Sequence, residues 1–206
     1  FYTGNFFQLL NPFGLLAGVV SLTMLVTQGA TYLQMRTTGE IHLRSRAAAQ
    51  IATLIMAVCF LLAGVWLVKG IDGFVVTSAL DTLAESNPMR KEVAHQAGAW
   101  LINFNKYPLL WALPALGVVL PLFTILFSRL EKGALAFVTS SLTIACVILT
   151  AGVTMFPFVM PSSTVPNVSL TMWDATSSLL TLKVMTVVAA IFVPIVLAYT
   201  SWSYYK

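Results

Sequence analysis

Charge is scarce in this sequence. Only 9% of its 206 residues are Asp, Glu, Lys or Arg, whereas soluble domains carry about 25%. Hydrophobic residues make up 58%, and the mean hydropathy is +0.88. Because too few polar side chains are available to cover a water-facing surface, this composition indicates a protein whose solvent is lipid. The net charge of +4 does not indicate nucleic-acid binding, because the basic residues form short clusters between apolar runs.

Cysteine and histidine are also scarce. Cys59 and Cys146 each lie inside an apolar run, and no CxxC pattern is present, so we expect neither a disulfide nor a thiolate metal site. A haem in a helical bundle is held by His, Met or Cys. The two histidines lie outside the apolar runs, His42 in a basic loop and His95 in a predicted surface helix. The sequence therefore predicts no imidazole at membrane depth.

Recognisable catalytic patterns are missing as well. No Ser-His-Asp set, phosphate-binding loop or cluster with metal-ligand spacing is present. Met24 and Met56 occur in the middle of apolar runs, where we interpret them as packing residues. We predict that this chain has no catalytic residue and no metal or haem ligand of its own.

What the sequence does contain is five long apolar runs, each able to cross about 30 Å of hydrocarbon. They span about residues 12–35, 47–68, 108–128, 134–160 and 178–203. We therefore predict an all-α fold, an integral membrane bundle of five transmembrane helices, with residues 1–206 forming a single membrane domain.

The long polar segment 70–107 contains a helix-start signal at Asn87-Pro88. Apolar residues follow at helical spacing, namely Val93, Ala97, Trp100, Leu101 and Phe104. We expect a short amphipathic helix lying on the membrane surface.

The stretch Met155–Ser178 closes the fourth run and opens the fifth. Pro157 and Pro161 are expected to end helical hydrogen bonding, because proline has no backbone N–H. The residues Thr171-Met-Trp-Asp174 match a capping box, and Trp173 suits the membrane interface.

A few polar side chains are candidate site residues. Gln28, in the first run, needs a hydrogen-bond partner if it is buried in lipid. It can make a structural bond between helices, serve a proton path or, together with Thr31 and Trp173, contact a quinone or lipid. Asp174 can cap a helix or take part in a proton path. Lys183 can extend to the outer membrane surface or pair with Asp174.

The distribution of Lys and Arg predicts an orientation. The 161–177 connection contains neither, whereas the 36–46 loop contains Arg, the 129–133 loop contains Arg and Lys, and the chain ends at Lys206. The positive-inside rule places the basic loops in the cytoplasm. We therefore expect the N-terminal end of this chain outside and the C-terminal end inside. Because the sequence starts with Phe1 instead of Met, we also expect it to be part of a longer protein.

Six short stretches, in order along the chain, carry a family resemblance. They are GNFFQLLNPFG (4–14), GIDG (70–73), NP (87–88), GAW (98–100), FPFVMPSS (156–163) and TMWDATSS (171–178). In these stretches the chain resembles subunit II of the cytochrome bd-type quinol oxidases, in particular the bd-I-like ones. One departure is Gln28-Gly29-Ala30, where many members have His-Gly-Ala, which argues against an essential imidazole there.

The resemblance implies a stabilising subunit that ligates no haem, built from roughly nine helices of which this chain supplies the last five. It implies a haem-bearing partner, subunit I, with haem b and haem d, in the bacterial inner membrane. The resemblance also implies that the complex oxidises ubiquinol or menaquinol, reduces oxygen to water and contributes to the proton gradient across that membrane. Further expectations are a bound quinone or lipid and small single-helix accessory subunits.

A secondary transporter or channel subunit is the alternative, because prolines within helices and a Gln at membrane depth are found in transporters too. A transporter is expected to carry ionisable groups near the middle of the membrane, and the apolar runs contain none there.

Overall fold

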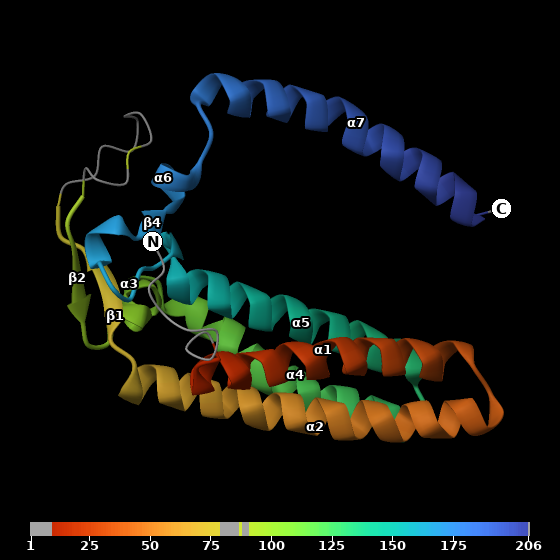
Figure 1. The fold of residues 1–206 in the computed structure, drawn as a ribbon. Coiled ribbons are helices and arrows are strands. Elements are labelled where there is room, and N and C mark those ends of the chain that lie inside the picture. Colours follow the sequence, from red (N-terminus) through yellow and green to blue (C-terminus); the bar gives the residue numbers. More distant parts are fainter. Residues whose placement is uncertain (1–9, 79–86, 88–90, 206) are drawn as a thin grey trace. The chain divides into compact units, whose positions relative to one another are not determined.

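The computed structural model describes residues 10–78, 87 and 91–205. The chain forms two compact units, one comprising the chain up to Phe74 and His95–Phe156, the other Val75–Ala94 and Pro157–Lys206. Among the described residues, five helices are long and apolar enough to cross a membrane; Figure 1 labels the helices along the chain. The predicted all-α membrane fold is therefore confirmed.

The first unit is built around four long helices. They are α1 (Pro12–Arg36), α2 (Gly39–Gly70), α4 (Ala112–Arg129) and α5 (Gly133–Met155). Helix α1 packs against α2 and α5, and α4 packs against the same two helices, so the four close into a bundle. At the start of α1, Asn11 accepts a hydrogen bond from the Gly14 amide at 2.5 Å, with Pro12 in the first turn.

Helix α2 begins earlier than the sequence predicts. It starts at Gly39 instead of about residue 47, so the predicted basic loop over 36–46 is wrong and only two residues separate α1 from α2. The charged residues are compatible with helix, since Arg44 and Glu40 form an (i, i+4) ion pair at 2.6 Å. His42 consequently lies on α2 and not in a loop.

Helix α5 ends earlier than predicted. It stops at Met155, and residues Phe158–Met160, which hydropathy places in the fourth run, form strand β3. The cause is Pro157, which forces the preceding Phe156 out of the helical region, to φ −57° and ψ 132°.

The segment between α2 and α4 is only partly helical. Its elements are β1 (Gly73–Val76), β2 (Val93–Gln96), η3 (Ala99–Leu101), α3 (Ile102–Lys106) and η4 (Pro108–Trp111). Strands β1 and β2 pair, so the predicted amphipathic helix is wrong at Val93 and His95, and Pro88 lies outside the described residues. The helical part follows Gly98, whose φ of +74° ends the strand segment. It does bury the predicted residues Trp100 and Phe104.

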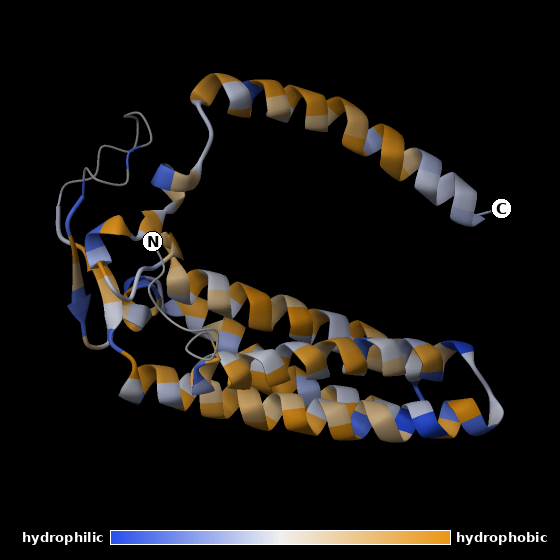
Figure 2. Ribbon diagram, viewed as in Figure 1, coloured by the Kyte–Doolittle hydropathy of each residue, from blue (hydrophilic) through white to orange (hydrophobic). Residues whose placement is uncertain are grey.

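The interior of the bundle is small and polar. An apolar cluster is formed by Val20, Met56 and Val147. The other buried positions in the long helices are mostly Ala, Ser and Thr, while many large apolar side chains are exposed. The ribbon coloured by hydropathy shows hydrophobic residues along all the long helices (Figure 2). Small interior residues let membrane helices approach closely, and lipid solvates the apolar exterior.

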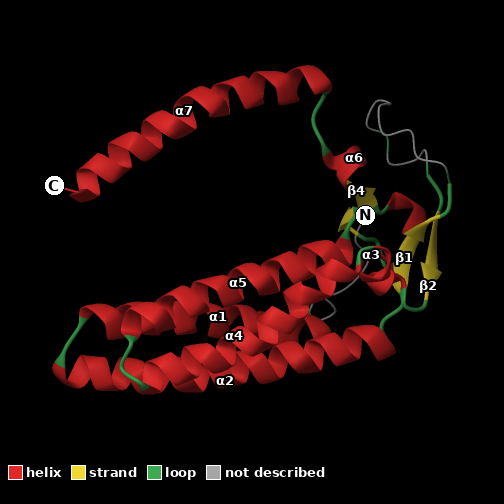
Figure 3. Cartoon of the chain, turned by 180° about the vertical axis from the view of Figure 1, so that it is seen from behind, coloured by secondary structure: helices red, strands yellow, loops and turns green. Residues whose placement is uncertain are grey.

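The second unit contains the remaining elements, shown as strands and helices in Figure 3. They are β3, η5 (Pro166–Val168), β4 (Leu170–Thr171), α6 (Met172–Ala175) and α7 (Leu179–Tyr205). Strands β3 and β4 are antiparallel, with Phe158 opposite Thr171. Trp173 and Asp174 belong to the separate one-turn helix α6 and do not open the last long helix. None of the residues of α7 is buried.

Candidate functional site

Polar side chains line the interface between the bundle helices. We call the following residues the polar seam: Thr27, Gln28, Thr31 and Gln34 on α1, Thr53 on α2, Ser128 on α4, and Ser140 and Ser141 on α5. All except Gln28 and Ser141 are buried. Because backbone and side-chain polar groups in a membrane interior have no water to bind, each of these side chains must find a partner within the protein.

Gln28 finds its partners on α5. Its Nε2 donates to Ser141 Oγ at 2.8 Å, and the Ser140 hydroxyl donates to its Oε1. Thr31 lies 3.3 Å from the same Ser140 oxygen and also donates to its own helix at Thr27 O, 2.9 Å away. The structure therefore brings Gln28 and Thr31 together at Ser140, in the arrangement expected of structural bonds between helices. Their role in quinone or lipid binding stays a prediction.

Gln34 makes a second link across the bundle, from α1 to α4. Its Nε2 donates to Ser128 O at 3.0 Å, and the Ser128 hydroxyl donates to its Oε1 at 2.9 Å. His42 Nδ1 lies 2.9 Å from Gln34 O. Because a carbonyl oxygen only accepts, this nitrogen is the protonated one, and the ring is oriented by the end of α1.

Three side chains of the kinds that can hold a haem make other contacts in this structure. Met56 is 1% exposed inside the apolar cluster, and Met24 packs against the same cluster. The His95 ring packs on Phe74 with centroids 4.5 Å apart. Within the described ranges, no group of three or more His, Cys, Asp or Glu side chains could hold a metal ion.

The second unit contains a buried ion pair. Lys91 Nζ donates to Asp174 Oδ2 at 2.6 Å, and the two side chains are 1% and 9% exposed. The backbone amide and the hydroxyl of Thr171 donate to the same oxygen at 3.0 and 2.5 Å. The predicted capping box of Thr171 and Asp174 is confirmed. Asp174 thus pairs with Lys91 and not with Lys183, which lies exposed on α7.

The surroundings of Asp174 determine its protonation. Burial raises the pKa of this carboxyl, but the hydrogen bonds from Lys91 and Thr171 and the charge of Lys91 lower it by more. The net pKa of Asp174 lies below its ordinary value, so the group is an anion at neutral pH.

A second link ties the same segments, because the Val93 amide donates to Asn167 Oδ1 at 2.8 Å. We call the Lys91–Asp174 and Val93–Asn167 contacts the loop clasp.

Several of these partners are not among the residues that the sequence singles out. Lys91 carries no local signal, since its partner is 83 residues away. Gln34 could have been found, because it continues the Thr27 and Thr31 face at helical spacing. Trp173 is half-buried on α6, in the second unit, whereas Gln28 and Thr31 belong to the bundle.

These features define a polytopic helical membrane protein with hydrogen-bonded helix interfaces. The family model for cytochrome bd terminal oxidase subunit II matches residues 1–206, and the chain belongs to this family. The recognition made from the six sequence stretches is thus confirmed.

Individual relatives agree. The chain is 70% identical over 206 residues to the cytochrome bd-I ubiquinol oxidase subunit 2 of Escherichia coli K12, covering 100% of the chain and 54% of the relative. It is 56% identical over 205 residues to a probable cytochrome oxidase subunit 2 of Haemophilus influenzae, with the same coverage. The Bacillus subtilis cytochrome bd ubiquinol oxidase subunit 2 is 26% identical over 196 residues, 95% of the chain and 49% of the relative. The chain spans about half the length of these relatives, and none of them supports the transporter alternative.

Proposed function

We propose that this chain forms part of subunit II of a respiratory quinol oxidase of the cytochrome bd type, in a bacterial inner membrane. The whole complex oxidises quinol and reduces oxygen to water, which contributes to the proton gradient. The observation that supports this function is the 70% identity to a bd-I ubiquinol oxidase subunit over the full chain.

Within that complex the role of this chain is structural. The packing of Met24, Met56 and His95 against other side chains supports the assignment of haems b and d to the partner, subunit I. The polar seam supports this role, because its residues bond to one another across helices and fix the bundle. Membrane lipid and small single-helix subunits are further partners.

The five spans belong to one membrane domain, with the N-terminal end of this chain outside and the C-terminal end in the cytoplasm. Supporting this, the turns at Thr37-Thr38 and at 130–132 lie at the same end of the bundle, next to Arg and Lys. The loop over 161–169 has none.

A quinone or lipid contact at Gln28, Thr31 or Trp173, and a proton path through Asp174 or Lys183, are secondary proposals. The first can be tested by adding a quinone analogue to the purified oxidase and to its Gln28→Leu variant. A ligand that contacts Gln28 raises the midpoint of thermal unfolding less in the variant. An equal rise in both contradicts the contact.

The structural role is tested by producing the whole subunit with and without its haem-bearing partner. We expect haem absorbance only when the partner is present, since the proposal assigns all haem ligands to the partner. A subunit that retains haem alone, with the spectrum of iron held by two axial ligands, contradicts the proposal.

A further inference from the structure

Cations gather at one end of the bundle, where α1 meets α2 and α4 meets α5. They are Arg36, Arg44, Arg46, Arg129 and Lys132, and we call this group the basic end. Two carboxylates accompany the five cations, Glu40 and Glu131, which leaves a net charge of +3. Those two are already occupied, because Arg44 pairs with Glu40 at 2.6 Å and Arg46 with Glu131 at 2.9 Å.

Three cations of the basic end therefore lack a carboxylate partner among the residues that the structure describes. They are Arg36, Arg129 and Lys132, and all three are exposed. The residues flanking them meet closely, since a Cβ on Gly133 would lie 3.1 Å from Met35 Cα. Like charges held together at one helix junction repel one another, and an external anion relieves that repulsion.

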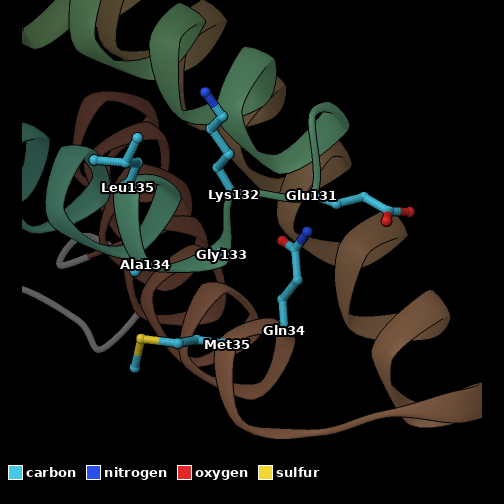
Figure 4. A pocket seen from close by; sticks show the side chains of 7 residues that line it. All are labelled: Gln34, Met35, Glu131, Lys132, Gly133, Ala134 and Leu135. Carbon is cyan, nitrogen blue, oxygen red and sulfur yellow. The ribbon is translucent and has the colours of Figure 1, made fainter.

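A groove lies at this junction, with a volume of about 460 Å³. Its lining is formed by Gln34, Met35 and residues 131–135 (Figure 4). In this view the Glu131 side chain extends away from Lys132, and Arg46 neutralises its charge. The groove thus has one cation of the basic end, Lys132, in its lining, and Arg36 follows its lining residue Met35 in the sequence. Its volume leaves room for a bulky polar group.

The surface beside the groove is apolar. Leu135, at its edge, is 45% exposed, and Tyr32 and Val138 are 47% and 52% exposed further along α1 and α5. The Tyr32 and Phe137 rings hold the two helices together, with centroids 5.9 Å apart. The basic end is thus followed by an apolar surface along α1 and α5. A molecule with an anionic head and long apolar tails matches this arrangement.

We propose that the basic end binds the phosphate head group of an anionic phospholipid, with its acyl chains along α1 and α5. This inference rests on the proposed membrane orientation, which places the basic end at the cytoplasmic leaflet. A zwitterionic lipid offers no net charge to the three unpaired cations. Basic clusters at the membrane surface gain about fivefold in affinity for anionic lipid per Lys or Arg.

The test uses the complete purified oxidase in nanodiscs and native mass spectrometry to count retained lipids. Phosphatidylglycerol is the anionic probe and phosphatidylethanolamine the zwitterionic one. The variant combines Arg36→Gln, Arg129→Gln and Lys132→Gln. The matched control is Lys69→Gln, which removes a cation beside an apolar groove of about 650 Å³ lined by residues of α1 and α2.

We expect the triple variant to retain about a hundredfold less phosphatidylglycerol, and the Lys69→Gln control to match the wild type. Replacing the same three cations so that each remains a cation (Arg36→Lys, Arg129→Lys, Lys132→Arg) should keep the affinity within a few-fold. Equal retention by the triple variant, an equal loss in the control, or no preference for the anionic lipid would overturn the proposal. Displacement by millimolar inorganic phosphate would overturn it too, because the site would then bind the anion alone. Haem content, measured on the same samples, reports separately on the proposed function.

Discussion

The Asp174 carboxylate holds two segments that are distant in the sequence. It caps its own helix through Thr171 and neutralises Lys91, whose side chain is 1% exposed. Asp174→Asn should destabilise the protein by about 3 kcal/mol, because a buried ammonium is left without an anion. Thermal unfolding of the complete oxidase measures the loss. Lys183→Gln is the matched control, since it removes an exposed cation, and should change stability by less than about 0.5 kcal/mol. Equal effects of the two changes contradict the role of the loop clasp.

The lowered pKa of the Asp174 carboxyl predicts that the stability of the folded protein depends on pH. Its pKa is lowered in the folded protein, below an ordinary value of about 3.9. A lowered carboxyl pKa stabilises the fold above the unfolded-state pKa, and this stabilisation disappears as the pH falls through the folded-state value. The stability gap between wild type and Asp174→Asn should therefore be constant from about pH 7 to about pH 5 and shrink below about pH 4. A gap that closes already near about pH 6 contradicts the lowered pKa.

Gln28 and Ser140 provide a test of the polar seam. A double-mutant cycle with Gln28→Leu and Ser140→Ala should give a coupling energy of about 0.6 kcal/mol, and at most about 1.7 kcal/mol. The value is modest because Ser140 can still donate to Phe137 O, 3.1 Å away. Thr150→Val serves as the control partner, since its hydroxyl bonds Cys146 O within α5. Its coupling to Gln28 should be near zero, and a coupling equal to that of Ser140 contradicts the interhelical bond.

At the residue scale, the sequence shows which polar groups need partners but not which residues those partners are. Gln28 stands out because an amide in an apolar run cannot stay unpaired. The capping box at Asp174 is local, so its four-residue pattern predicts it. Lys91 has no such pattern, since its pairing depends on how distant loops fold together.

At the scale of elements, the apolar runs predict that the helices exist, and the errors fall at their ends. Hydropathy underestimates the length of α2, because the stretch from Gly39 to Arg46 is helical but polar. Hydropathy overestimates the length of α5, because Phe158–Met160 is apolar but forms a strand. Proline is the better signal there, as Pro157 excludes helical geometry at Phe156.

One close approach of α5 to the α1 backbone occurs at a glycine, Gly133. A Cβ at Gly133 would lie 3.1 Å from Met35 Cα and 3.3 Å from its nitrogen, and backbone atoms cannot move aside as a side-chain tip can. Gly133→Ala should therefore cost about 1–3 kcal/mol despite the better helix propensity of Ala. Gly152→Ala is the matched control, because, apart from its chain neighbours and the nearby backbone of its own helix, no described atom lies within 4 Å of the position its methyl group would take. That change should be neutral or stabilising by up to about 1 kcal/mol. Thermal unfolding compares the two, and a stabilised Gly133→Ala variant contradicts close packing.

At the scale of the whole molecule, the bundle reverses the usual arrangement of a soluble protein. Its interior holds Thr, Ser and Gln, and its exterior holds Leu, Val and Ile. Burying apolar area cannot hold such a bundle together in lipid, so close packing and hydrogen bonds must do so. Composition alone predicts this solvent, whereas the assignment to subunit II of a cytochrome bd oxidase depends on membership of the family.

The predicted orientation of the molecule can be read out with thiol labelling. In a Cys59→Ala, Cys146→Ala background, single cysteines are placed at Ser163, in the loop without basic residues, and at Thr37, in the turn beside Arg36. A membrane-impermeant maleimide added to intact spheroplasts should label Ser163→Cys but not Thr37→Cys, because Lys and Arg hold their loops in the cytoplasm. Permeabilised cells should label both, which shows that each thiol is accessible. The reverse pattern in intact spheroplasts would show that the topology is the opposite of the predicted one. The basic end would then not lie at the cytoplasmic leaflet, where its anionic lipid is expected.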